Sequence, residues 1–307
     1  MMETFEWNWK TSLVPACPGG QARAQVQADG LQMYSKGWAP KGELKATIGL
    51  VHGHGEHIGR YEHVAAALTE KGYALLGFDL RGHGKSAGPR GHTPSYEALM
   101  NDIAAFFDQI ERRYPDLPRF LYGHSLGGNL VLNYALRRKP KLRGVIVTAP
   151  WLKLAFEPPA SKVWLGKMMN NILPGFTQAS GLETAALSHD PAVVKAYEND
   201  PLVHDKISAR MFVSIYDSGL WALEHAAEFP LPLLLMHGTA DRLTSADASR
   251  QYAEAAGKNV TLRLWDGWYH EIHNEPEKAQ VFKVMTDWLA ANLTGQTASI
   301  MAKSSPL

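Results

Sequence analysis

The sequence predicts an α/β fold in which a mostly parallel sheet carries helices on both faces and one long insertion interrupts the pattern. Along most of the 307 residues, short apolar runs of strand length alternate with longer amphipathic segments, which is typical of repeated βα units. Hydrophobic residues make up 45% of the chain and charged residues 20%, so there is enough material for a large buried core. The alternation stops after Pro150 and resumes only near Phe229, which predicts the insertion.

The first part of the predicted sheet comprises an opening hairpin and four buried strands. Asp29-Gly30 favours a tight turn, so we expect the hairpin to pair residues 22–28 with residues 32–38. The buried strands are expected at residues 46–51, 73–79, 120–122 and 144–148. Helices follow from apolar residues that recur three and four positions apart. They are expected at residues 61–71, 96–114 and 126–139.

The insertion has no strand pattern, and five prolines break it into short helical pieces. One piece carries two apolar rows at i, i+4 spacing, Trp164-Met168-Ile172 and Leu165-Met169-Leu173. These rows predict a helix with a two-row apolar face.

The sheet pattern then returns for the last part of the chain. Strands are expected at residues 231–236 and 261–265, and helices at 246–256 and 277–293. We therefore divide the chain into four parts: a first part of the core (21–150), the insertion (151–229), a second part of the core (230–293) and a loose polar tail (294–307).

Charge and cysteine content narrow the possible functions. The net charge is only +1, so nothing points to nucleic acid or to another strongly charged partner. The single cysteine, Cys17, excludes an intramolecular disulfide and agrees with a reducing compartment. Met1 to Thr11 lack the features of a signal peptide, and no run reaches the about 18 apolar residues of a membrane span. We expect a soluble, cytoplasmic protein.

Ser125 is the candidate nucleophile. It lies between the predicted strand 120–122 and a helix that begins at Leu126, with Gly123 and Gly127 two residues to either side. This G-x-S-x-G pattern is typical of a sharp strand-to-helix turn that exposes a serine hydroxyl. An ordinary glycine-rich βα loop has the same five-residue pattern, so the residues that accompany the serine must decide between the two.

A serine nucleophile needs a histidine as base and an acid to orient that histidine. In enzymes with this turn, the partners follow in the order serine, acid, histidine, in loops after later strands. Asp241 follows the strand that ends at Met236, and His270 follows the next strand. Asp266 and Asp247 are rival acids, but neither follows the first strand after the insertion. The sequence therefore predicts Ser125, Asp241 and His270 as a catalytic triad.

The loop at residues 52–57 allows two interpretations. Its glycines let the backbone approach a reacting carbonyl, so we expect the His54 N–H, together with the Leu126 N–H, to stabilise the oxyanion. The alternative is a metallohydrolase in which a metal pair, held by His52, His54, Glu56 and His57, activates water as the nucleophile. That alternative leaves the serine turn unexplained and requires further ligands.

Five motifs stand along the chain in one order: His52 to His57 with Gly59-Arg60-Tyr61, Phe78 to Ser86 with Arg90-Gly91-His92, Gly123 to Gly128, His237 to Asp241, and Tyr269-His270-Glu271. In these motifs and their order the chain resembles the α/β-hydrolases of the monoacylglycerol lipase and lysophospholipase family, over residues 22–293. The resemblance implies that residues 151–229 form a helical cap over the carboxyl edge of the sheet. It also implies the triad and the oxyanion donors named above.

The resemblance further implies a set of residues that hold the glycerol end of the substrate. They are Glu56, Arg60, His124, Tyr197 and His273. The family often has a small or apolar residue where this chain has His54. Because the expected oxyanion donor is the backbone N–H, this difference affects local polarity and not the predicted activity.

The predicted activity is hydrolysis of monoacylglycerols to fatty acid and glycerol, without a metal or organic cofactor. Lysophospholipase and general short-chain carboxylesterase activity are the alternatives. The expected partner is a small lipid ester, and no protein partner is implied. For the apolar helix of the cap, three environments are open: an acyl tunnel, packing on the core, or peripheral contact with a membrane or micelle through Trp164, Leu165 and Phe176.

Overall fold

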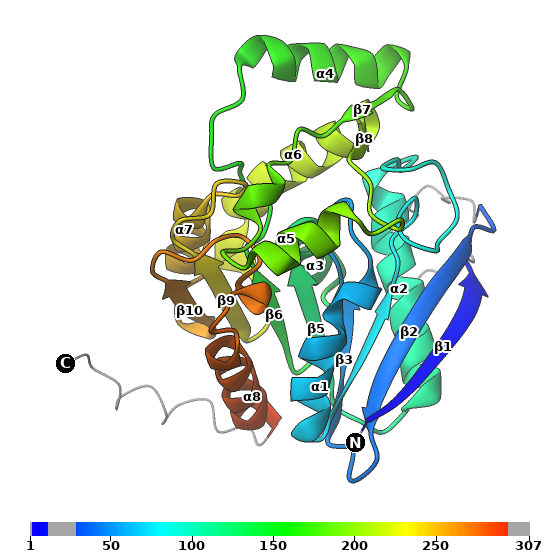
Figure 1. Ribbon diagram of the computed structural model, residues 1–307, viewed down its shortest axis with the longest axis vertical. Coiled ribbons are helices and arrows are strands. Elements are labelled where there is room, and N and C mark those ends of the chain that lie inside the picture. The colour runs from blue at the N-terminus through cyan, green and yellow to red at the C-terminus, as the bar shows by residue number, and fades with distance from the viewer. Residues whose placement is uncertain (1, 12–28, 294–307) are drawn as a thin grey trace.

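The computed structural model describes residues 2–11 and 29–293 and has an eight-stranded sheet at its centre (Figure 1). In spatial order the strands are β1 (Met2–Lys10), β2 (Gln32–Pro40), β4 (Tyr73–Phe78), β3 (Ala46–Val51), β5 (Arg119–His124), β6 (Gly144–Thr148), β9 (Leu233–Gly238) and β10 (Val260–Trp265). All strands from β4 to β10 pair in parallel, whereas β2 is antiparallel to both of its neighbours. The predicted mostly parallel sheet is confirmed.

The register of the parallel strands aligns their carboxyl ends at one edge. Val51 at the end of β3 lies opposite Phe78 of β4 and Gly123 of β5. On the other side of β5, His124 lies opposite Thr148 at the end of β6. Loops that leave these strands therefore meet above the same edge.

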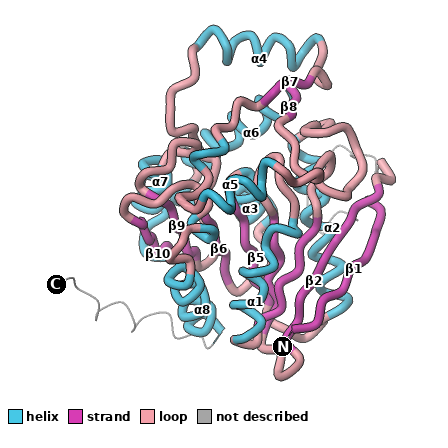
Figure 2. Tube along the Cα trace, in the orientation of Figure 1, coloured by secondary structure: helices cyan, strands magenta, loops and turns pink. Residues whose placement is uncertain are grey.

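Helices cover both faces of the sheet (Figure 2). Side chains of α1 (Glu62–Glu70) and α8 (Ala279–Leu293) belong to one buried cluster. Side chains of α2 (Tyr96–Arg113), α3 (Leu126–Arg138) and α7 (Ala246–Ala256) belong to the other. These bounds agree with the predicted helices within two residues, because the apolar positions of each helix meet the sheet at regular spacing.

The first edge of the sheet differs from the prediction. The partner of β2 is β1, with Trp9 opposite Met33, and the Trp9 indole N–H donates to the Ser35 hydroxyl at 2.8 Å. The core thus begins at Met2, and its predicted start at residue 21 is too late. The predicted strand at residues 22–28, Cys17 and the predicted tail at residues 294–307 lie outside the described residues.

The segment between β6 and β9 lies above the carboxyl edge of the sheet (Figure 1). It contains α4 (Ala160–Ile172), β7 (Thr177–Ala179), α5 (Pro191–Glu198), β8 (Lys206–Ser208) and α6 (Ala209–Glu224), with short 3-10 turns at Thr184–Ala186 and Ala226–Glu228. The prediction of a strandless segment is wrong in one detail, since β7 and β8 form a small antiparallel sheet. Each has only three residues, which is too short to produce a recognisable alternation.

The helix with the two apolar rows is α4, and none of its residues is buried. Trp164 is 66% exposed and Ile172 69%. Within residues 2–11 and 29–293, none of the helices combines the length and the apolar character that a membrane span requires.

Candidate active site

Ser125 occupies a strained turn between β5 and α3. Its φ of 54° and ψ of −114° lie in a region that non-glycine residues rarely adopt. The neighbouring glycines make the turn possible: a Cβ on Gly123 would lie 2.4 Å from the Gly127 carbonyl oxygen, and one on Gly127 only 1.9 Å from that of Val51. The predicted sharp strand-to-helix turn is therefore present, and it places the serine at the carboxyl edge of the sheet.

His270 and Asp241 are in direct contact. The His270 Nδ1–H donates to Asp241 Oδ2 at 2.7 Å, which leaves Nε2 as the ring nitrogen available to Ser125. Both His270 and Ser125 line the same cavity. Burial acts to raise the pKa of Asp241, but the neighbouring imidazoles of His270 and His237 hold it well below its usual value. Burial acts to lower the pKa of His270, yet the Asp241 carboxylate raises it above its ordinary value.

The rival acids lie elsewhere. The Asp266 carboxylate accepts from the Thr239 hydroxyl at 3.0 Å in an exposed turn. Asp247 is on the surface of α7, where its side chain is 93% exposed and lies 3.8 Å from Arg250. Of the three aspartates considered, Asp241 is the one bonded to His270.

A second histidine shares the Asp241 carboxylate, and sequence reasoning did not identify it. His237 lies in β9, fully buried, with Nε2 2.9 Å from Asp241 Oδ2 and Nδ1 2.7 Å from the Ser249 hydroxyl. Asp241 Oδ1 also accepts from the Thr244 N–H at 3.1 Å. These bonds fix the plane of the carboxylate. The i, i+4 spacing of His237 and Asp241 was the available signal, but such a spacing across the end of a strand and the loop after it has no fixed geometry.

The cavity at Ser125 measures about 850 Å³, a size typical of sites for small organic ligands. Most of its wall is apolar and comes from residues after β6. They include Trp151, Leu154, Phe156, Leu165, Met169, Phe176, Leu187 and Phe212. Glu56, His124 and Glu271 line the wall beside the serine, and we call this part of the wall the polar end. The rest of the wall is mostly apolar and also contains Lys162, Gln178 and Ser180.

The loop of residues 52–57 forms the wall beside Ser125. Gly53 and His54 line the cavity, and the Gly53 N–H donates to Glu56 Oε1 at 2.7 Å. Leu126 is the first residue of α3, so its N–H belongs to the set at a helix start that has no partner within the helix. Burial lowers the pKa of His54 to about 3, so its ring is neutral at physiological pH.

The same loop does not have the geometry of a metal site. The His52 Nδ1–H donates to the Gly53 carbonyl at 2.7 Å, and Nε2 accepts from the Leu80 N–H at 2.9 Å. His57 is also engaged at both ring nitrogens, by Asp200 at 2.9 Å and the Gly59 N–H at 3.1 Å. Across the part of the chain that the structure describes, no three acidic, histidine or cysteine side chains form a group able to hold a metal ion.

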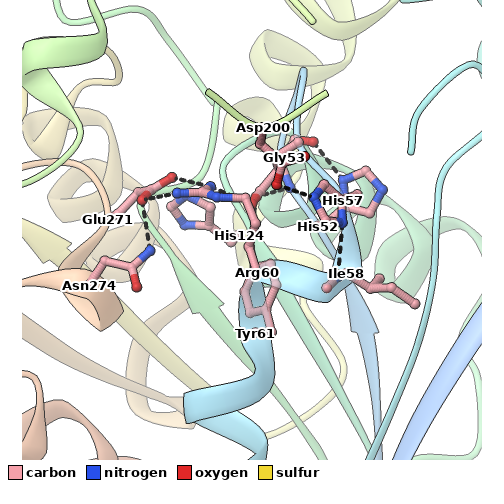
Figure 3. A network of polar contacts seen from close by, with 12 residues as sticks. His52, Gly53, His57, Ile58, Arg60, Tyr61, His124, Asp200, Glu271 and Asn274 are labelled. Carbon is pink, nitrogen blue, oxygen red and sulfur yellow. Dashed lines mark hydrogen bonds and ion pairs between the residues drawn. The ribbon is translucent and has the colours of Figure 1, made fainter. Parts of the chain in front are cut away.

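Arg60 lies between two carboxylates (Figure 3). Its Nη1 donates to Glu56 Oε2 at 2.7 Å and to Glu271 Oε1 at 2.6 Å, and Nη2 donates to Glu271 Oε2 at 2.8 Å. Tyr197 of α5 covers the guanidinium, with its ring centre 4.7 Å away. Glu56 and Tyr197 line the cavity, but Arg60 is one layer behind the wall.

His124 and His273 form a second pair at the polar end. The His124 ring lies 4.8 Å from that of His270 and 4.7 Å from that of His273, and its Nδ1 is 3.0 Å from the Thr148 hydroxyl. Burial lowers the pKa of His124 to about 3, with a further contribution from His270. His124 lines the cavity, whereas His273 lies behind it, stacked on Tyr61 at 5.0 Å. Of the five residues that the resemblance implies at the glycerol end, three line the cavity and two support it.

Comparison with known proteins agrees with this fold. A family model described as serine aminopeptidase, S33, matches residues 42–277. A monoacylglycerol lipase of Mycolicibacterium smegmatis is 33% identical over 83% of this chain and 92% of its own length. An uncharacterised abhydrolase domain-containing protein of Dictyostelium discoideum is 39% identical over 82% of this chain, which spans only 27% of that protein's length.

Among solved structures, the monoacylglycerol lipase of Paleococcus ferrophilus has a TM-score of 0.77 and 36% identity. The match covers 85% of this chain and 99% of that one. Fold, sequence and the arrangement at the carboxyl edge agree, and the chain belongs to the serine aminopeptidase S33 family of α/β-hydrolases.

Proposed function

We propose that this protein hydrolyses the ester bond of monoacylglycerols, releasing a free fatty acid and glycerol through an acyl-enzyme on Ser125. The observation that carries the proposal is the position of Ser125 and His270 in one cavity with an apolar and a polar end. The relatives named as monoacylglycerol lipases support the same substrate class. The chain is accordingly a carboxylic ester hydrolase.

The proposed reaction has two steps. His270 takes the proton of the Ser125 hydroxyl as the oxygen attacks the acyl carbonyl, and the N–H groups of His54 and Leu126 stabilise the oxyanion. His270 then protonates the departing glycerol. A water molecule, deprotonated by the same imidazole, attacks the acyl-enzyme; the bond to Ser125 Oγ breaks, His270 returns the proton to that oxygen, and the fatty acid is released. Asp241 holds the tautomer of His270 and stabilises its positive charge.

The charge at the polar end favours a neutral head group. Glu56 and Glu271 lie there, and the single guanidinium of Arg60 lies between them. Burial raises the pKa of Glu56, whereas at Glu271 the effect of burial is outweighed by Arg60, which lowers the pKa and keeps this carboxylate ionised at neutral pH. A phosphate group placed against this wall would meet like charge, whereas glycerol hydroxyls can donate hydrogen bonds to it. This favours a monoacylglycerol over a lysophospholipid.

Residues 151–229 are proposed to act as a cap whose helix α4 touches a lipid surface. Trp164 and Ile172 of α4, and Leu173 and Phe176 just after it, are each about half exposed or more. Leu165 and Met169 of α4 line the cavity. One helix thus connects an exposed apolar surface to the substrate site, which suits a substrate drawn from a micelle or membrane. We propose a cytoplasmic location with peripheral lipid contact.

The test compares monoacylglycerols of rising chain length with diacylglycerol, lysophosphatidylcholine and a short activated ester. We expect the highest kcat/KM for a monoacylglycerol, and the Ser125→Ala enzyme should lose roughly 10⁶-fold in kcat while remaining folded. Ordinary turnover by Ser125→Ala would refute the acyl-enzyme. A preference for lysophosphatidylcholine or for the short ester would instead assign the lysophospholipase or carboxylesterase alternative.

A further inference from the structure

Two loops from opposite ends of the chain meet behind the cavity wall. One is the loop of residues 52–57, which carries the proposed oxyanion donor, and the other begins at His270, the proposed base. Arg60 and Glu271 are separated by 211 positions in sequence, yet their side chains form two hydrogen bonds of 2.6 and 2.8 Å. The reaction requires both loops to keep a fixed distance, since attack and oxyanion stabilisation take place on one carbonyl.

We propose that Arg60 is a positioning residue that locks the oxyanion loop to the histidine loop, with Glu56 and Glu271 as the two carboxylates it joins. The proposal rests on the proposed function, because it assigns this lock to the same reaction. In this role Arg60 fixes the distance between the two loops and does not bind the substrate itself.

On the oxyanion side, the lock reaches the backbone through Glu56. The Gly53 N–H donates to Glu56 Oε1, and the Tyr61 hydroxyl donates to the same oxygen at 2.8 Å. Gly53 directly precedes His54, so this bond sets the orientation of the peptides beside the proposed donor. Glu56 Oε2 receives Arg60 Nη1 at 2.7 Å. Both oxygens of this carboxylate are therefore occupied by groups of the loop and its following turn.

On the histidine side, the lock reaches the backbone through Glu271, the residue next to His270. Glu271 Oε2 also accepts from the Asn274 amide at 2.7 Å, and the Glu271 backbone N–H donates to the Leu187 carbonyl at 2.8 Å. The side chain is 2% exposed. A carboxylate with this many donors and so little access to water holds its position, and with it the backbone that carries His270.

The carboxylates of the lock also influence the pKa of His270. The titratable and charged groups around His270 include Asp241, His124, His237, His273, Glu56, Glu271 and Arg60. Burial acts to lower the pKa of His270, and after Asp241 the carboxylates of Glu271 and Glu56 act to raise it. Burial acts to raise the pKa of Glu271, but Arg60 lowers it to about 2. Glu271 therefore stays ionised at neutral pH.

The experiment uses four variants of the full chain and one control. Glu271→Gln keeps the shape of the side chain but removes its charge, and Arg60→Lys keeps the charge but cannot hold both carboxylates in the same geometry. Glu56→Gln, alone and combined with Glu271→Gln, measures the coupling between the two carboxylates. Arg81→Lys is the matched control, because Arg81 forms a similar buried pair with Asp102 at 2.6 and 2.7 Å away from the cavity.

Steady-state kinetics on a monoacylglycerol and the rate of fluorophosphonate labelling are measured against pH. We expect Arg60→Lys to lower kcat by roughly tenfold to a hundredfold with little change in KM, since misplaced reacting groups cost about this much. In Glu271→Gln, loss of the negative charge lowers the pKa of His270. The acid limb of kcat/KM should therefore move to lower pH. The two glutamate variants should be non-additive, because both carboxylates bind Arg60. Arg81→Lys should leave the acid limb in place.

Two results would overturn the lock. If Arg60→Lys raised KM and left kcat unchanged, Arg60 would be assigned direct substrate binding. If the effects of the two glutamate substitutions were additive and the acid limb of kcat/KM stayed in place, Arg60, Glu56 and Glu271 would have only a structural role. Failure of the proposed function is a separate result. It would appear as turnover by Ser125→Ala, or as absence of labelling in the unsubstituted enzyme, whatever the Arg60 variants do.

Discussion

Helices α2 and α4 have similar apolar patterns and opposite environments. In α2, Leu99, Ile103, Phe106 and Ile110 are fully buried against the sheet. In α4, two equally regular rows have no buried residue, and Trp164 and Ile172 are about two-thirds exposed. Periodicity thus predicts a helix and the face that is apolar, but the rest of the chain determines what covers that face. For α2 the cover is protein, and for α4 we propose lipid and the acyl chain of a substrate.

The site residues also fall into two groups, those in loops of the sheet and those in the segment between β6 and β9. Ser125, Asp241 and His270 all follow strands of the sheet, whose pairing fixes their positions. Most of the apolar cavity wall comes from the segment above. We infer that changes in the sheet loops alter the chemical step, whereas changes in the cap alter binding and access.

The largest expected difference compares Asp241→Asn with Met169→Ala. Asp241 Oδ2 accepts from His237, Thr244 and His270, and an amide cannot accept all three bonds or stabilise the imidazolium. We expect kcat to fall by roughly 10⁴-fold. Met169→Ala shortens one side chain of the acyl wall and should cost at most about 3 kcal/mol, mainly in KM. Steady-state kinetics on one monoacylglycerol measure both variants. A comparable loss of kcat in Met169→Ala would show that the cap, like the sheet loops, acts on the chemical step.

A matched pair of isoleucines tests burial directly. Ile103 of α2 is fully buried, whereas Ile172 of α4 is 69% exposed. Ile103→Ala should lower the free energy of unfolding by about 2–5 kcal/mol, because it removes apolar contacts and leaves a cavity. Ile172→Ala should change it by no more than roughly 0.5 kcal/mol. Urea unfolding followed by circular dichroism gives both values, and equal losses would mean that α4 is part of the core.

The core and the meeting of Ser125, Asp241 and His270 at one edge of the sheet could be predicted because their causes are local or repeat regularly. Alternating strands and helices imply parallel pairing, and parallel pairing brings the loops of Asp241 and His270 to the edge where Ser125 lies. The lock between Arg60 and Glu271 could not be predicted in this way. It depends on how closely the loop of residues 52–57 approaches the loop that begins at His270. That distance is set by the packing of side chains, which the sequence pattern does not reveal.

Other features escaped prediction for different reasons. The first strand at Met2–Lys10 alternates Phe5, Trp7 and Trp9, but a search for a targeting segment does not test for an edge strand. Strands β7 and β8 pair over three residues each, which is too few to show the alternation of apolar and polar residues that identifies a strand. His237 shares Asp241 with His270, and only coordinates show that two histidines reach one oxygen.

A smaller effect concerns the proposed lipid contact of α4. Trp164→Ser combined with Ile172→Ser should weaken binding to phosphatidylcholine vesicles by tenfold or more, since each apolar side chain that leaves water contributes about 1.5–3 kcal/mol when fully buried. Hydrolysis of a short soluble ester should stay unchanged. Asn171→Ser on the same helix is the control, and vesicle co-sedimentation is the measurement. If the double variant bound vesicles as well as the unsubstituted protein, the apolar face of α4 would not be a lipid contact.

The smallest expected effect comes from the ion pair between α4 and α6. Lys167 Nζ lies 3.0 Å from Asp217 Oδ1, and both side chains are about half exposed. Water and salt screen such a pair, so Asp217→Asn should change the free energy of unfolding by less than about 1 kcal/mol. The effect should instead be local, because no side chain of α4 is buried and a helix held by few buried contacts can open without global unfolding.

Hydrogen exchange tests this local opening. In Asp217→Asn the amides of α4 should exchange faster while those of α2 do not, and added salt should reduce the difference between the variant and the unsubstituted protein. If exchange accelerated equally in both helices, α4 would unfold together with the core. Its exposed apolar rows would then belong to the same cooperative unit as the buried rows of α2, and the contrast between the two helices would concern solvent contact alone.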